Sequence, residues 1–310
     1  MYQAQRASRS EFVPVRNLNY HVRVWGQQSG SVAPLVLVHG FCGDLNNWMF
    51  NHPALAAERR VIALDLPGHG ESDKQLQHGD LDELSRSVLA LLDHLDLERV
   101  HLAGHSMGGA VVLNLARLAP TRAQSLCLIA SAGLGREING GYLHGIVTAG
   151  NRNALKPQMS QLFSDPALVT RQMLEDMLRF KRLEGVDSAL QQLAAALADG
   201  DVQRHDLRAV VAQQPTLVLW GSDDAIIPAT HVDGLPAEVE ILLVNDNDLN
   251  AFATRGRIMG VNTGLILRTK TPGELLGVMA HEAGHIKNRH TLRDGAENAG
   301  KQPMFMTMAL

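Results

Sequence analysis

Short apolar runs alternate with helical patterns between residues 34 and 130. The runs PLVLVHG, RVIALDLP, RVHLAG and SLCLIA are rich in branched side chains and bounded by turn residues. Between two of them, leucine and valine recur at helical spacing over residues 81–95, and Asp80 with Glu83 forms a capping pair at the start. Strands that alternate with helices in this way indicate βαβ units and a mostly parallel sheet.

The strand pattern stops from about 133 to 213, where the chain becomes rich in leucine, alanine and glutamine with helical periodicity. Helices inserted between two strands of such a sheet usually form a cap over the strand ends. Strands resume at 216–221 and 239–244. The pattern therefore predicts an α/β domain over residues 1–244, with a doubly wound, mostly parallel sheet and a helical cap.

After residue 245 the pattern changes again. The stretch NDNDLNAFATRGRIMGVNTGLIL is followed by a strong helix pattern, in which Thr271, Pro272 and Glu274 supply a cap, a first-turn proline and a capping-box partner. We interpret residues 245–310 as a second, shorter segment.

A serine motif joins a strand to a helix at residues 104–109, GHSMGG. The chain needs glycines two residues before and after Ser106, because a serine on so tight a turn leaves no room for side chains there. Ser106 is the predicted nucleophile, and the backbone amides of Met107 and Phe41 are the predicted oxyanion donors. The predicted acid is Asp224 in WGSDDAIIP, with Asp223 as the competitor.

The stretches HGFCGD, DLPGHGESD, GHSMGG and WGSDDAIIP together resemble the α/β-hydrolase family. Within it, residues 33–243 are similar to the hydrolase-like module of the acetyltransferase components of acetoin-cleaving dehydrogenase complexes. The resemblance implies a serine hydrolase or acyltransferase that acts on a small acyl or ester substrate without a cofactor.

The family's triad histidine follows the last strand, but here that position reads NDNDLNAFATRG, without histidine. The resemblance therefore implies impaired serine catalysis. We interpret His231 as a surface or capping residue, and we expect neither His39 nor His105 to act as the base.

A second motif, HEAGH, lies at residues 281–285. Residues four apart share one helical face, so His281 and His285 could bind one zinc ion while Glu282 activates a water molecule. The surrounding sequence resembles the zinc metallopeptidase family of the prenyl-protein proteases and periplasmic quality-control peptidases. That resemblance implies a third ligand, a glutamate further along the chain. Glu297 is the candidate, but it could reach the zinc only if the chain doubled back sharply. We therefore expect weak zinc binding.

The composition of the chain excludes some classes of binding partner. The net charge of −4 and the lack of a lysine and arginine cluster argue against nucleic acid. No apolar run is long enough for a membrane span, and we expect a cytoplasmic protein in which Cys42 and Cys127 stay reduced. Three functions remain open: a serine acyl hydrolase or acyltransferase with reduced activity, a zinc-dependent metalloendopeptidase, and a non-catalytic fusion or binding module.

Overall fold

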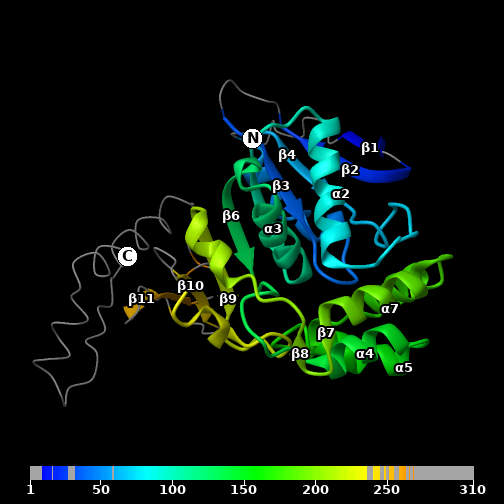
Figure 1. Ribbon diagram of the computed structural model, residues 1–310. Helices are drawn as coiled ribbons and strands as arrows, with labels where there is room; N and C mark the ends of the chain where they lie inside the picture. The colour runs from blue at the N-terminus through cyan, green and yellow to red at the C-terminus, as the bar shows by residue number, and fades with distance from the viewer. Residues whose placement is uncertain are drawn as a thin grey trace, which may run out of the picture.

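The computed structural model describes most of the chain up to residue 268 (Figure 1). The described residues are 9–15, 17–26, 32–57, 59–235, 240–244, 248, 251–254, 258–262, 265 and 268. The expected helix of the C-terminal segment, with His281, Glu282 and His285, lies outside the described residues, and so does Glu297.

One ten-stranded sheet forms the centre of the molecule, in the order β1-β2-β4-β3-β5-β6-β9-β10-β12-β11. The strands are β1 Arg9–Val15, β2 Leu18–Trp25, β3 Leu35–Val38, β4 Val61–Leu64, β5 Val100–His105, β6 Ala123–Ile129, β9 Thr216–Gly221, β10 Glu240–Val244, β11 Ala251–Thr254 and β12 Ile258–Asn262. Pairing is parallel from β4 through β3, β5, β6, β9 and β10 to β12, and antiparallel at both ends. The predicted α/β class with a mostly parallel sheet is confirmed.

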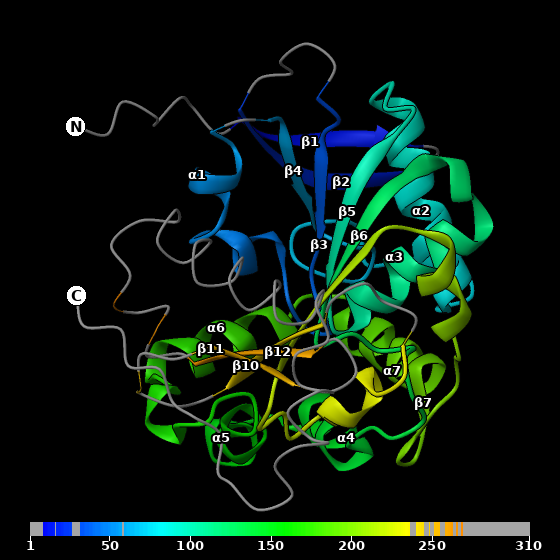
Figure 2. The same cartoon turned by 90° about the vertical axis from the view of Figure 1, so that its left-hand side faces the viewer.

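Helices cover both faces of this sheet. Figure 2 shows α1 (His52–Leu55) on the opposite side from α2 (Leu81–His94) and α3 (Met107–Leu118). All four residues of β4 are buried, as expected for a strand that is covered on both faces. The predicted capping pair forms differently from expected: Asp80 accepts the Glu83 amide, whereas the Glu83 carboxylate accepts amides of residues 77–79.

Four helices make the cap over the carboxyl ends of the strands (Figures 1 and 2). They are α4 Gly140–Thr148, α5 Arg152–Ser160, α6 Arg171–Lys181 and α7 Val186–Leu197. Buried Lys181 joins two of them, because its Nζ donates to the carbonyl oxygens of Ile146 at 2.6 Å and Val147 at 2.5 Å. A small hairpin, β7 Ala198–Asp199 with β8 Val202–Gln203, lies within the predicted cap and was not predicted.

Beyond β10 the sheet continues. β12 pairs in parallel with β10, and β11 pairs antiparallel with β12. The sequence pattern predicted no strands after 244, so the segment from residue 245 contributes two unexpected strands to the hydrolase sheet. None of the helices in the described part of the chain has the length and apolar character that crossing a membrane requires.

Candidate active site

Ser106 occupies a strained turn between β5 and α3. Its φ of 53° and ψ of −117° lie outside the regions that residues other than glycine usually adopt. A Cβ on Gly104 would overlap the Gly108 carbonyl, and a Cβ on Gly108 would overlap the carbonyls of Val38 and His39. The glycine spacing is therefore required by the close packing of this turn against the end of β3.

Two free amides accompany this serine. Neither the Met107 nor the Phe41 backbone N–H donates a hydrogen bond to another described residue. Both residues line one cavity with Ser106, and Met107 is the first residue of α3. Amides at a helix start that carry no partner can stabilise negative charge on a substrate oxygen. The structure thus brings together Ser106 and its two predicted oxyanion donors.

Asp224 lines the same cavity from the turn after β9. Its Oδ1 accepts the amides of Ile226 at 2.8 Å and Ile227 at 3.0 Å, whereas its Oδ2 has no hydrogen bond to a described residue. The competing Asp223 is exposed and bonds to Ser222. The more enclosed position and the free oxygen favour Asp224 as the predicted acid.

His39 is held in place by both of its ring nitrogens. Nδ1 lies 2.8 Å from the Gly40 carbonyl, and Nε2 lies 3.0 Å from the Leu66 amide. Nδ1 must therefore donate and Nε2 must accept, which fixes the neutral form. Burial lowers the pKa of this ring, although the charge of Asp65 acts in the opposite direction. His39 has no free nitrogen for Ser106.

His105 lies at the cavity beside Ser106. Solvent reaches the ring, but the surrounding protein still lowers its pKa by desolvation, and the nearby charge of Asp224 raises it. The ring packs against the loop after β3. A Cβ on Gly40 in that loop would lie only 2.9 Å from the Nδ1 of His105. It makes no hydrogen bond to Ser106 or Asp224.

The expectation that His231 is a surface residue was wrong. The side chain is 3% exposed, its Nε2 lies 2.9 Å from Glu137 Oε2, and its ring meets the edge of Trp220. The chain turns inward in the short 3-10 helix Ala229–Val232, which places the ring against β9. His231 does not line the cavity that contains Ser106.

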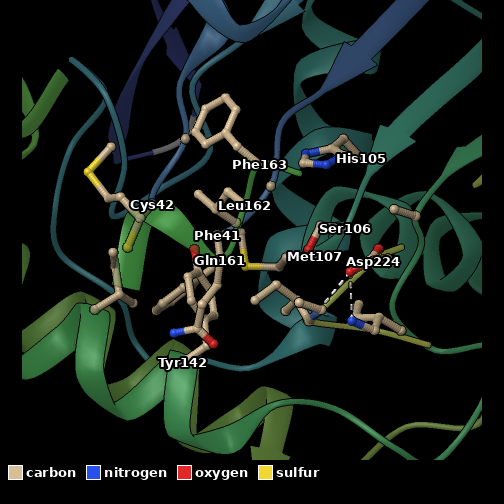
Figure 3. A pocket seen from close by; sticks show the side chains of 18 of the residues that line it. Phe41, Cys42, His105, Ser106, Met107, Tyr142, Gln161, Leu162, Phe163 and Asp224 are labelled. Atoms are coloured by element: carbon tan, nitrogen blue, oxygen red, sulfur yellow. Dashed lines mark hydrogen bonds between the residues drawn. The ribbon is translucent and has the colours of Figure 1, made fainter. Parts of the chain in front are cut away.

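The cavity has a volume of about 520 Å³ between the cap and the strand ends. Figure 3 shows Ser106, Met107 and Asp224 on one side and Cys42 and Tyr142 on the other. Burial raises the pKa of Cys42 to about 12 and raises that of Tyr142 as well, so both are neutral. Among described residues no lysine or arginine lines the cavity, and its apolar wall comes mainly from the cap: Ile138, Leu143, Ile146, Met159, Met173 and Met177.

The described residues contain no group of three or more histidine, cysteine, aspartate or glutamate side chains placed to hold a metal ion. The predicted zinc residues His281 and His285, and the predicted base Glu282, lie outside that part of the chain. The zinc site stays a prediction.

Comparison with known proteins agrees with this geometry. A family profile described as the alpha/beta hydrolase fold matches residues 33–241, which is more than half of the chain. The chain therefore belongs to the α/β-hydrolase fold family. A profile of peptidase family M48 matches residues 225–310, so the two matches overlap at 225–241.

The particular relatives are bacterial. The chain is 76% identical over 211 residues to the dihydrolipoyllysine-residue acetyltransferase component of the acetoin cleaving system of Pseudomonas putida, covering 68% of this chain but only 57% of that protein. It is 30% identical to a 2-hydroxy-6-oxononadienedioate/2-hydroxy-6-oxononatrienedioate hydrolase of Cupriavidus pinatubonensis, covering 72% and 81% of the two chains. The solved meta-cleavage product hydrolase of Pseudomonas fluorescens shares the fold, with a TM-score of 0.65 at 19% identity over 76% of this chain and 88% of that one.

Proposed function

We propose that the chain is a serine acyl hydrolase or acyltransferase whose turnover is low, because none of the histidines that the structure describes connects Ser106 to Asp224. One observation carries the proposal: Ser106, two free amides and Asp224 meet in one cavity, while no described histidine bonds to either side chain. The hydrolase and acetyltransferase names of the relatives support the reaction class.

In this proposal the Ser106 hydroxyl attacks the carbonyl carbon of an ester or thioester. The oxyanion that forms accepts hydrogen bonds from the amides of Met107 and Phe41. Within the described part of the chain, no side chain is hydrogen-bonded to Ser106 as a base that could receive the serine proton. General-base catalysis is typically worth about 10²- to 10⁴-fold in rate. The strained turn that carries Ser106 and the two oxyanion donors alone therefore support only slow acylation of the serine.

The cavity favours an uncharged acyl group of moderate size. Its wall is mostly aliphatic and methionine side chains, and its charged members are the carboxylates Asp223 and Asp224. A dicarboxylate, such as the substrate in the name of the Cupriavidus hydrolase, would need a cation that the lining does not supply. Neutral short- and medium-chain esters are the substrates to test.

The test is hydrolysis of p-nitrophenyl butyrate by the full chain and by Ser106→Ala, together with mass spectrometry after a fluorophosphonate probe. We expect slow labelling at Ser106 and a wild-type rate less than about a hundredfold above the variant, the low end of what a general base contributes. Fast, complete labelling and a rate far beyond that limit would show that a histidine does serve Ser106.

A second candidate function, metalloendopeptidase activity, is favoured by the M48 profile match at 225–310. His281 and His285 would hold the zinc, which would polarise a water molecule that Glu282 deprotonates. It ranks second because a catalytic zinc normally has three protein ligands. In the remaining alternative, a non-catalytic fusion or binding module, the cavity would bind its ligand without turnover.

A further inference from the structure

We propose that the cavity is also a binding site for a small imidazole-type base, which would lie between Ser106 and Asp224 and restore catalysis. The inference rests on the proposed function, since imidazole would supply the base that the described part of the chain does not place beside Ser106. The ligand class is an uncharged heteroaromatic ring with one nitrogen that accepts a hydrogen bond and one that donates.

Two observations place the serine and the acid in the same part of the cavity. Both line the same cavity, and Figure 3 shows them on the same side of it. In addition, the Asp224 carboxylate acts electrostatically on the ring of His105, the residue next to Ser106. A small molecule that enters this side of the cavity therefore meets both side chains.

The acid is prepared for an additional donor. Asp224 Oδ1 is fixed by the amides of Ile226 and Ile227, so the orientation of the carboxylate is set by the backbone. Oδ2 has no hydrogen bond among the described residues. An N–H group that reaches Oδ2 would gain a charge-assisted hydrogen bond without displacing an existing one.

The histidines near the site do not compete for this position. His39 uses both nitrogens, and His231 is bonded to Glu137 away from the cavity. His105 lines the cavity but packs against Gly40 and bonds neither Ser106 nor Asp224. Among the described residues, the position between the nucleophile and the acid is thus left to a ligand.

The chemistry is balanced without any further reactant. The unprotonated nitrogen of imidazole accepts the Ser106 proton as Oγ bonds to the ester carbonyl carbon, and its N–H donates to Asp224. The tetrahedral intermediate expels the alcohol, which takes the proton from imidazolium. A leaving group that departs as an anion, such as p-nitrophenolate, leaves this proton on imidazolium, which then releases it to solvent. Imidazole then removes a proton from water, which attacks the acyl-serine. The acid is released, and both Ser106 and imidazole are regenerated.

The experiment measures p-nitrophenyl butyrate hydrolysis at about pH 8, where imidazole is mostly neutral, while the imidazole concentration is raised. At each concentration the rate with Ser106→Ala is subtracted, because free imidazole also cleaves the ester. We expect the difference to rise by about tenfold or more, the scale of a partial general base, and to saturate. A difference that stays flat would overturn the proposal.

Two comparisons test the role of the acid. Asp224→Asn keeps an acceptor oxygen for the amides of Ile226 and Ile227 but loses the charge, so we expect most of the imidazole effect to disappear. 1-Methylimidazole lacks the N–H, so it should stimulate the wild type much less than imidazole does. Equal stimulation by both bases, or by wild type and Asp224→Asn, would refute a bridge to Asp224.

The outcome is separable from that of the proposed function. The proposed function is tested by the wild-type and Ser106→Ala rates without imidazole, and the inference by their difference as imidazole is added. A wild type that is already fast contradicts low turnover, whereas a slow wild type that imidazole does not stimulate contradicts only the binding site.

Discussion

His69 should make the stability of this protein fall as the pH drops below neutral. The ring is completely buried and lies in the loop between β4 and α2. It contacts the rings of His39, Phe41 and Phe180. Its Nδ1 lies 3.3 Å from the Pro67 carbonyl, and its Nε2 has no hydrogen-bond partner among described residues. Desolvation by burial, reinforced by the charge of His39, lowers the pKa from 6.5 to about 3.

The sign follows from which state binds the proton. Between pH 6.5 and 3 the unfolded chain protonates His69 while the folded chain keeps it neutral, so acid favours unfolding. At about pH 5.5, one unit below the unfolded pKa, this difference amounts to about 1.4 kcal/mol of lost stability. Asp65 does not contribute at this pH, because its pKa is lowered below 3.8 and its share of the stability is lost only in stronger acid.

The assay is equilibrium urea unfolding of the wild type and His69→Gln at about pH 7.5 and 5.5. His39 also has a lowered pKa and contributes to acid destabilisation. The measured quantity is therefore the difference between the two proteins in how much stability acid removes. We expect the wild type to lose about 1.4 kcal/mol more than His69→Gln over this interval. The matched control is His78→Gln, since His78 is exposed and lies in the same loop between β4 and α2 as His69. This variant should lose as much stability in acid as the wild type does.

Equal losses for the wild type and His69→Gln would refute the reasoning, because the folded protein would then bind the proton as readily as the unfolded chain. That result would mean that the buried Nε2 has access to a hydrogen-bond acceptor or to water.

Three further predictions concern packing and metal. Gly108→Ala should lower the free energy of unfolding in urea by about 1–3 kcal/mol, because its Cβ would overlap the carbonyls of Val38 and His39. Gly150→Ala, with open space around it, should lower it little, and equal effects would contradict the packing reason. Lys181→Met should destabilise the protein by about 1–3 kcal/mol, since the carbonyls of Ile146 and Val147 lose their donor. Hydrogen exchange in α4 should also accelerate, and unchanged exchange would argue that Lys181 does not hold α6 to α4. Zinc should be lost on dialysis against a mild chelator, and one zinc per chain that survives dialysis but disappears in His285→Ala would overturn the expectation of weak binding.

The central strands could be predicted from the sequence because they are covered on both faces. Such strands read as continuous apolar runs, and the predicted strand at 216–221 coincides with β9. β1 and β2 pair antiparallel at the edge and mix exposed with buried positions, as Phe12 at 57% exposed shows. An edge strand has no uninterrupted apolar run, so the pattern that revealed the centre could not reveal these two.

The candidate site divides in the same way. Ser106 and its glycines could be found because the geometry depends on neighbours in sequence, and the turn after β9 could be found because it follows a recognisable strand. The hydrogen-bond partner of buried His231 is Glu137, 94 residues away in sequence, and no local pattern encodes such a contact. Helical periodicity in the cap also does not distinguish a side chain that lines a cavity, such as Met173, from one that fills a core.

The parallel ladder between β10 and β12 has a consequence for how the two family matches share one sheet. A strand edge offers only amides and carbonyls, and these bond to any extended backbone whatever its side chains. Ile241 of β10 lies where the two family matches overlap. It pairs with Leu219 of β9, which only the hydrolase profile matches, and with Met259 of β12, which only the peptidase profile matches. One continuous ladder of backbone hydrogen bonds thus joins strands that match different families, and this ladder sets no requirement on their side chains.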